Sequence, residues 1–138
     1  MQKSTILNRR LAGFTLNEML VVLAIIGALL LIAYPNLMPL ITKAKSQEAK
    51  INLKHIANLQ SMYRYTNSTF SMELEAIGFE TPKSQQQGGT ALYEYQILQA
   101  EATTFKVQAE AVVDFDGDGV LNLWQIDQDG KPTEVVKD

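Results

Sequence analysis

The feature that most constrains this chain is an apolar run near its N-terminus. No polar side chain occurs from Met19 to Ala33, and residues 14–41 are almost wholly apolar. As one helix this segment reaches about 42 Å, at about 1.5 Å per residue, which exceeds the bilayer hydrocarbon core of about 30 Å. The run therefore predicts a membrane-spanning helix.

The flanks of the run predict how it is inserted. Residues 1–13 carry three basic residues and no acid, which favours an N-terminus on the cytoplasmic side and the bulk of the chain outside. Lys43 and Lys45, beyond the run, act against this rule. The stretch LLLIAYPNL offers no small-x-small cleavage site, so the run is expected to be retained in the exported protein. An uncleaved signal anchor is an alternative.

Two prolines and a glycine lie within the apolar segment. Pro35 and Pro39 each remove a backbone donor, and Gly27 weakens the helix before them. The helix is therefore expected to continue but to bend, or to loosen locally, between Gly27 and Pro39. For Pro35 we expect a bend or melting point used in assembly. The alternative is a proline that a membrane helix merely tolerates.

Glu18 lies at the edge of the run. A carboxylate next to hydrocarbon is costly, so such an acid is a functional-site hypothesis by default. The alternative is an interfacial acid that only marks the membrane boundary. An opposite charge in the same low-dielectric surroundings would attract Glu18 strongly, and an unpaired Glu18 would tend to bind a proton.

Charge divides the rest of the chain into two zones. Residues 42–65 hold five basic side chains against one acid, a balance of +4, and residues 66–138 hold four lysines against thirteen acids, a balance of −9. The acidic zone argues against nucleic acid as a direct ligand. The helix lysines are expected to be solvated, with contact to the acidic half of a neighbouring subunit as an alternative. The chain has no cysteine, which excludes disulfides and thiol catalysis.

Beyond Thr42 the hydrophobic period is helical, with one face to pack and one face in water. No glycine separates this stretch from the apolar run, so one long helix is expected over about residues 15–65, ending at Asn67-Ser68-Thr69. The packing face is expected to contain Ala49, Leu53, Ile56, Leu59, Gln60 and Tyr63.

Alternating hydrophobicity predicts an antiparallel sheet in the second half of the chain. Two runs alternate over 93–97 and 105–113, joined by AEATT. VLNLWQID is expected to be a third strand with Leu121 and Leu123 on one face, and TEVV a short fourth. SMELEAIGFE is expected to be helical or irregular, and PKSQQQGG a flexible loop. The fold class is α+β, in which a sheet of three to four strands covers the second half of the helix.

The string DFDGDGVLN has the spacing of a partial calcium loop. Asp114, Asp116 and Asp118 occupy positions one, three and five, and Asn122 occupies position nine. Position twelve, which should be a bidentate carboxylate, is Gln125. These four residues are candidate calcium ligands. The alternative is a hairpin turn whose Asp-Gly pairs only supply positive φ.

No nucleophile–base pair, phosphate loop or catalytic carboxylate pair occurs, so no enzyme activity and no other cofactor are expected. His55, the single histidine, has no second ligand or nucleophile arranged with it in the sequence. Gly13 lies just before the apolar run. Because glycine has no side chain, it lets a protease approach the backbone closely there.

GFTLNEMLVVLAIIGALLLIAYP resembles the class III signal segment of type IV pilins and of type II secretion pseudopilins. The resemblance covers about residues 9–40 and rests on the basic leader, Gly13-Phe14, Glu18, the apolar helix and Pro35. A helix that runs into a small antiparallel sheet is also similar to that family. Asn17 departs from the apolar residue or serine that many relatives carry there.

The resemblance implies three parts: a leader over 1–13 that is removed, a transmembrane and filament-core helix over 14–41, and a periplasmic or extracellular head over 42–138. A prepilin peptidase would cut between Gly13 and Phe14 and methylate the new amine of Phe14. Glu18 would pair with that amine on a neighbouring subunit. The implied partners are other copies in a helical filament, the peptidase, and the inner-membrane assembly platform.

Two functions in this family remain open. One is a pseudopilin of a type II secretion system, favoured by the small head, the missing cysteines and the DFDGDG loop. The other is a pilin of a surface pilus for attachment, motility or DNA uptake. Outside the family, a membrane-anchored binding domain that never polymerises is a further alternative.

Overall fold

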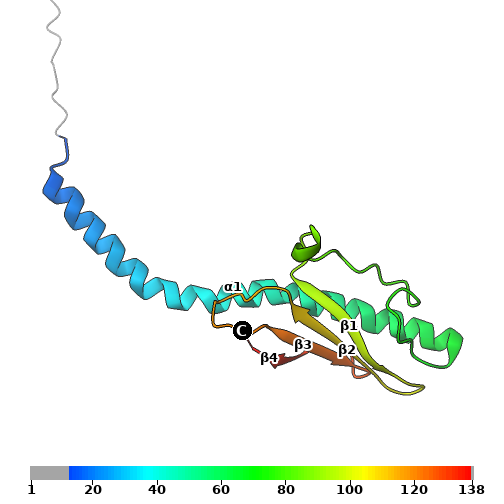
Figure 1. The fold of residues 1–138 in the computed structure, drawn as a ribbon. Coiled ribbons are helices and arrows are strands. Elements are labelled where there is room, and N and C mark those ends of the chain that lie inside the picture. Colours follow the sequence, from blue (N-terminus) through cyan, green and yellow to red (C-terminus); the bar gives the residue numbers. More distant parts are fainter. Residues whose placement is uncertain (1–12, 138) are drawn as a thin grey trace, which may run out of the picture. The chain divides into compact units, whose positions relative to one another are not determined.

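The computed structural model describes residues 13–137, which fall into two compact units, Met1–Asn36 and Leu37–Asp138. Apart from Gly13, the predicted leader lies outside the described residues. The element order is one long helix, a short 3₁₀ helix and four strands (Figure 1). The α+β prediction is confirmed.

Helix α1 runs over Leu16–Asn67 and contains Gly27, Pro35 and Pro39 without a break in its helical assignment. The prediction of one continuous helix is confirmed, and no local melting appears between Gly27 and Pro39. The helix ends where expected. Ser68 adopts a positive φ of 59°, and its N–H donates to the carbonyl of Arg64 at 2.8 Å, which caps the last turn.

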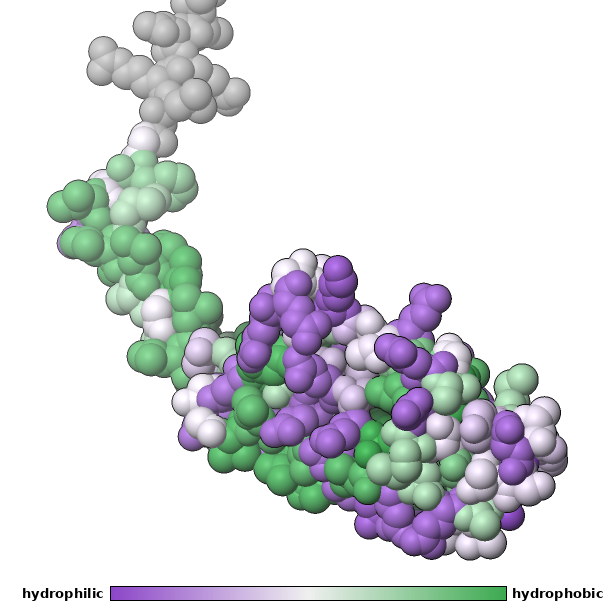
Figure 2. Space-filling view, turned by 45° about the vertical axis from the view of Figure 1, so that its right-hand side comes forward, coloured by the Kyte–Doolittle hydropathy of each residue, from purple (hydrophilic) through white to green (hydrophobic). Residues whose placement is uncertain are grey.

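In the first unit, every described side chain from Gly13 to Asn36 is exposed. Figure 2 shows this stretch as an almost unbroken hydrophobic surface. Within the described residues, α1 is the one helix long and apolar enough to cross a membrane, and none of its apolar window is buried inside the protein. Residues of this kind need a membrane or other helices around them.

The second unit contains a four-stranded antiparallel sheet in the order β1-β2-β3-β4. Its strands are β1 (Tyr93–Ala100), β2 (Phe105–Ala111), β3 (Leu123–Asp127) and β4 (Thr133–Val136). Alternate residues of β1 to β3 are buried, as the period-two pattern predicts. These buried residues face the second half of α1 and form one core with it.

Most of the predicted packing face of α1 is in this core. Ala49, Leu53 and Ile56 are fully buried, and Leu59 and Tyr63 are partly buried against the cluster. Gln60 is also fully buried although it is polar. Its Nε2 donates to the carbonyl of Ser71 at 2.7 Å, and the Ser71 N–H donates to its Oε1 at 2.9 Å. The Gln60 amide therefore pairs with both backbone groups of Ser71, as a neighbouring strand would, and fixes the chain that follows the helix.

Two details of the sheet and its loops differ from the sequence prediction. The third strand begins at Leu123 rather than at Val120, because the loop with the sequence DFDGDG and the residues that follow it come first. Leu121, predicted to lie in the strand, is therefore outside it and is 39% exposed. The predicted flexible loop contains a 3₁₀ helix, η1 (Gln85–Gln87), closed by hydrogen bonds from Gln87 N–H and Gly89 N–H to the Ser84 carbonyl. In agreement with the irregular alternative, SMELEAIGFE contains turns over residues 74–78 and no helix.

Candidate functional site

The segment directly before α1 is exposed and has no regular secondary structure. Gly13 and Phe14 are exposed and have no regular structure, with Phe14 at 80% exposure. A Cβ added to Gly13 would meet no atom within 4 Å in the structure, and no positive φ requires a glycine there. Packing among the described residues therefore does not explain this glycine.

The start of α1 is a capping box, which the sequence analysis missed. Thr15 is the N-cap, and its N–H and Oγ1 both donate to Oε2 of Glu18, at 2.7 and 2.9 Å. In return, the Glu18 N–H donates to Thr15 Oγ1 at 3.3 Å. The signal is the pattern Thr-x-x-Glu before an apolar run. Glu18 thus has a structural role within its own subunit, and a charge partner in a neighbour would be a second role.

The three predicted aspartates do converge. One carboxylate oxygen from each of Asp114, Asp116 and Asp118 lies within 4.8 Å of the others. Asp114 organises the loop: its Oδ1 accepts from Gly117 N–H at 2.6 Å and its Oδ2 from Gly119 N–H at 2.7 Å. These bonds hold the pKa of the Asp114 carboxyl below its usual value.

The loop geometry explains its glycines. Gly117 and Gly119 both have a φ of 87°, a conformation that other residues rarely adopt. Phe115 anchors the loop in the core, where it is 7% exposed, its ring centroid 5.8 Å from that of Tyr93, and where Lys45 lies over its ring at 4.5 Å. A buried aromatic between two acids, Asp114 and Asp116, fixes the loop to the head.

The side chain of Asn122 is engaged by core partners. It is fully buried, and its Oδ1 accepts from Tyr93 OH at 2.7 Å and from Trp124 Nε1 at 2.6 Å. Its Nδ2 donates to Glu134 Oε1 at 2.9 Å and to the Val136 carbonyl at 3.2 Å. The expected ligand at position nine is thus a core residue that joins β4 to the sheet, because its amide meets two donors and two acceptors there.

Gln125 does not complete a calcium loop either. Its amide donates to Gln108 Oε1 at 3.3 Å on the outer face of the sheet. The donor set that fits a hard cation is therefore the three aspartate carboxylates, with the remaining coordination left to backbone oxygens or water.

A long apolar N-terminal helix that continues into a helix–sheet head, preceded by an open Gly13-Phe14 step, is the architecture of a pilin-type protein. Residues 35–119 match the family model described as "Type IV minor pilin ComP, DNA uptake sequence receptor". Residues 8–34 match the "Prokaryotic N-terminal methylation motif". The chain belongs to this type IV pilin family, and its methylation motif implies processing by a prepilin peptidase, as expected for a membrane-anchored precursor.

Relatives from both branches of the family match part of the chain. The type IV major pilin protein PilA of Myxococcus xanthus is 37% identical over 81 residues, which are 59% of this chain and 37% of that protein. The type II secretion system core protein G of Dickeya chrysanthemi is 35% identical over 72 residues, 52% of this chain and 47% of that protein. The Aeromonas hydrophila core protein G is 35% identical over 89 residues, 59% of this chain and 62% of that protein. The chain thus spans less than two thirds of each of these relatives.

Proposed function

We propose that this protein is a pseudopilin, a structural subunit of the filament of a type II secretion system. The observation that carries a filament role is the exposed apolar stretch of α1 before Leu37. A lone anchor needs only to span the bilayer, whereas a bundle of such helices buries the same surface in a filament core. The proposed role is structural, not enzymatic.

Coverage of the relatives supports the secretion branch. The matched part makes up 62% and 60% of the core G proteins from Aeromonas hydrophila and Vibrio cholerae, but 37% of the Myxococcus pilin. The matched part of this chain therefore accounts for a larger share of those two pseudopilins than of that pilin. We place the N-terminus in the cytoplasm and the head in the periplasm.

A minor pilin of a surface pilus is the second candidate, favoured by the family model over residues 35–119. Direct DNA binding by the head is not part of this proposal. Phosphate binding needs available Lys and Arg side chains. Residues 66–138 hold four lysines against thirteen acids, and Lys45 and Lys50 of α1 lie over aromatic rings.

Deleting the gene separates the two candidates. If the chain is a pseudopilin, the deletion strain retains secreted proteins in its periplasm, and surface pili are unchanged under electron microscopy. The wild-type gene supplied in trans is the control. Normal secretion together with lost pili or lost DNA uptake would overturn the pseudopilin proposal and support the second candidate.

Processing is part of the same proposal. The peptidase cuts between Gly13 and Phe14, and Phe14 becomes a methylated amine that meets Glu18 of a neighbouring subunit. The exposure of Gly13 and Phe14 supports a cut at this step. Pro35 is proposed as the place where the helix adapts on assembly. An exported chain that still begins at Met1 or Gln2 would contradict the cut.

Calcium binding at Asp114, Asp116 and Asp118 is proposed as a stabilising feature of the head. In calcium titrations of the full-length protein in detergent, we expect the thermal midpoint to rise at millimolar calcium, because an ion that binds only the folded loop stabilises it. Magnesium is the matched ion control. Asp116→Asn should reduce the rise without removing the hydrogen bonds that Asp114 makes. No shift with calcium would leave the loop as a hairpin turn only.

A further inference from the structure

The part of α1 inside the head separates two surfaces that carry opposite charge. We call the first the acidic groove, formed by Glu48, Asn52, His55, Phe79, Glu80 and Thr90. We call the second the basic flank, formed by Gln47, Lys50, Ile51, Lys54, Trp124 and Pro132. Both belong to the compact unit Leu37–Asp138.

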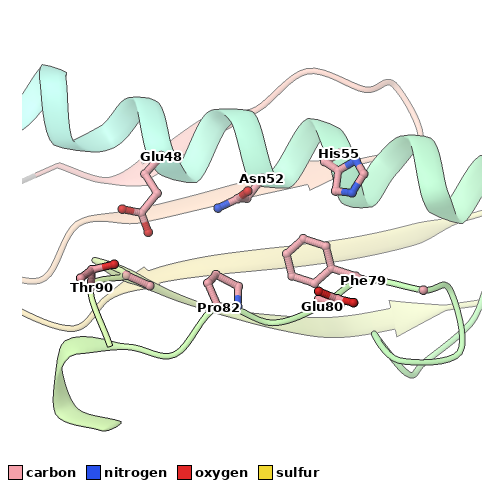
Figure 3. Close-up of a pocket in the computed structure, with 9 residues that line it drawn as sticks. Glu48, Asn52, His55, Phe79, Glu80, Pro82 and Thr90 are labelled. Atoms are coloured by element: carbon pink, nitrogen blue, oxygen red, sulfur yellow. The ribbon is translucent and has the colours of Figure 1, made fainter. Parts of the chain in front are cut away.

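The acidic groove has a volume of about 480 Å³ and lies between α1 and the segment around residues 78–91. Figure 3 shows Glu48, Asn52 and His55 on the helix above Phe79, Glu80 and Thr90. Two hydrogen bonds join the helix side of the groove to β1 and to the residue before it: Glu48 Oε1 accepts from Leu92 N–H at 2.9 Å, and Asn52 Nδ2 donates to Tyr95 OH at 2.8 Å. The lining holds two carboxylates and no Lys or Arg.

Glu80 is the available charge of this groove. It is exposed, and among the described residues 13–137 neither a hydrogen bond nor an ion pair engages its carboxylate. His55, across the groove, contacts the ring of Phe79 with a centroid distance of 5.9 Å. A cationic side chain that enters the groove would therefore meet Glu80 first.

The basic flank has the complementary chemistry. Lys50 Nζ lies 4.4 Å from the centroid of the Trp124 ring, which holds one positive charge in place. Lys54 is exposed and, within residues 13–137, has no hydrogen-bond or ion-pair partner. Ile51 lines the same flank and is 65% exposed, so the flank offers an apolar contact beside its charges. No acid lines it.

The two surfaces cannot meet within one chain. At 3.6 residues per turn, Glu48, Asn52 and His55 project to one side of the buried face of α1, and Lys50 and Lys54 to the other. Each copy therefore carries one surface of each kind. A contact between unlike surfaces of two copies leaves one of each free, so it can repeat, and it generates an open helical assembly where the rotation between copies does not close into a ring.

We propose that the acidic groove of one subunit binds the basic flank of the next, with Glu80 facing Lys54, and that this contact sets the register of the heads. This rests on the proposed filament function. Exposed ion pairs are individually weak and are screened by salt, so their effect is orientation and choice of partner. Adhesion comes from the apolar half of α1.

The absence of cysteine in the sequence allows a direct test. The full-length double variant Lys54→Cys/Glu80→Cys is produced in cells that assemble the filament and treated with a short bismaleimide. We expect a ladder of cross-linked species that extends beyond the dimer, because every subunit carries both halves of the contact. Each single variant should give no ladder. The matched control pair is Met72→Cys/Gln96→Cys, two exposed positions outside both surfaces, and it should also give none.

Filaments sedimented from the same cells distinguish a failure of the proposed contact from a failure of the proposed filament function. Filaments without a ladder would overturn the contact and leave the filament function standing, as would cross-links to a different protein. No filament even for the wild-type chain would overturn both. As a second measurement, Lys54→Glu and Glu80→Lys should each lower the sedimented fraction several-fold, because each reversal makes like charges face each other across the contact, and their combination should restore it. Equal loss in the combined variant would contradict the pairing.

Discussion

Replacing Glu18 by glutamine is expected to reduce filament assembly to background while leaving the start of α1 intact. Glutamine at this position still accepts a hydrogen bond from the Thr15 N–H, so the capping box is retained. What is lost is the negative charge that we propose meets the methylated Phe14 amine of a neighbour. In the low dielectric of a helix bundle, that amine would remain unpaired, which is strongly unfavourable. Sedimented filaments, quantified by immunoblot, measure the result.

Thr15→Val is the matched control. It removes the cap hydroxyl, which costs about 0.5–2 kcal/mol at other helix N-termini, but retains both the Glu18 charge and the Thr15 backbone donor. Assembly should persist. Wild-type assembly of Glu18→Gln would show that the cap is the whole role of Glu18. A loss of equal size in Thr15→Val would lead to the same conclusion. The intact mass of each variant must correspond to a chain that begins at methylated Phe14, so that processing is not the cause.

Asn122→Leu is expected to destabilise the head by about 2–6 kcal/mol. Leucine has a similar volume but removes the acceptor that Tyr93 OH and Trp124 Nε1 share, and losing a partner of a buried polar group costs about 1–3 kcal/mol. It also releases Glu134 and the Val136 carbonyl on β4. A domain of this size loses about 4–8 °C of thermal midpoint for each kcal/mol.

The measurement is chemical or thermal unfolding of the full-length chain in detergent, followed by the fluorescence of the single tryptophan, Trp124. Gln125→Leu is the control, because its amide is only partly buried and makes one 3.3 Å bond on the outer face of the sheet. Its effect should stay within about 0.5 kcal/mol. If Asn122→Leu changed stability as little as Gln125→Leu, the hydrogen bonds of Asn122 would not hold the head together, and a ligand role for this residue would regain support.

Periodicity predicted the helix and the strands well, because a helix or strand with one buried face repeats its apolar side chains at a fixed spacing. The alternation of Tyr93 and Tyr95 with polar residues requires no knowledge of what they pack against. The same holds for the turn at Ser68, where polar residues end a helical period. Polar residues with specific partners were harder. Gln60 fitted the apolar stripe by position, but its reciprocal bonds with Ser71 depend on where the chain goes next.

In the candidate site, too, local spacing predicted some side-chain positions and partners distant in sequence decided others. The spacing of Asp114, Asp116 and Asp118 predicted that their carboxylates converge, since a tight Asp-Gly loop brings alternate residues together. The same spacing also proposed Asn122, whose amide is engaged by core partners in the structure. Its direction is decided by Tyr93 and Trp124, which lie on two different strands and meet it only once the sheet has formed.

The N-terminal segment is the part that the sequence determined by itself. A helix exposed on all sides needs only its own apolar composition, and the capping box needs only residues three apart, so both follow from local order in the chain. The head required the tertiary structure. Its charges became opposite surfaces only when α1 packed on the sheet, because burial of one helix face determines which side each remaining residue occupies. Local sequence establishes periodicity and helix caps. Residues distant in sequence decide which polar groups are hydrogen-bonded within the protein and which stay available for another molecule.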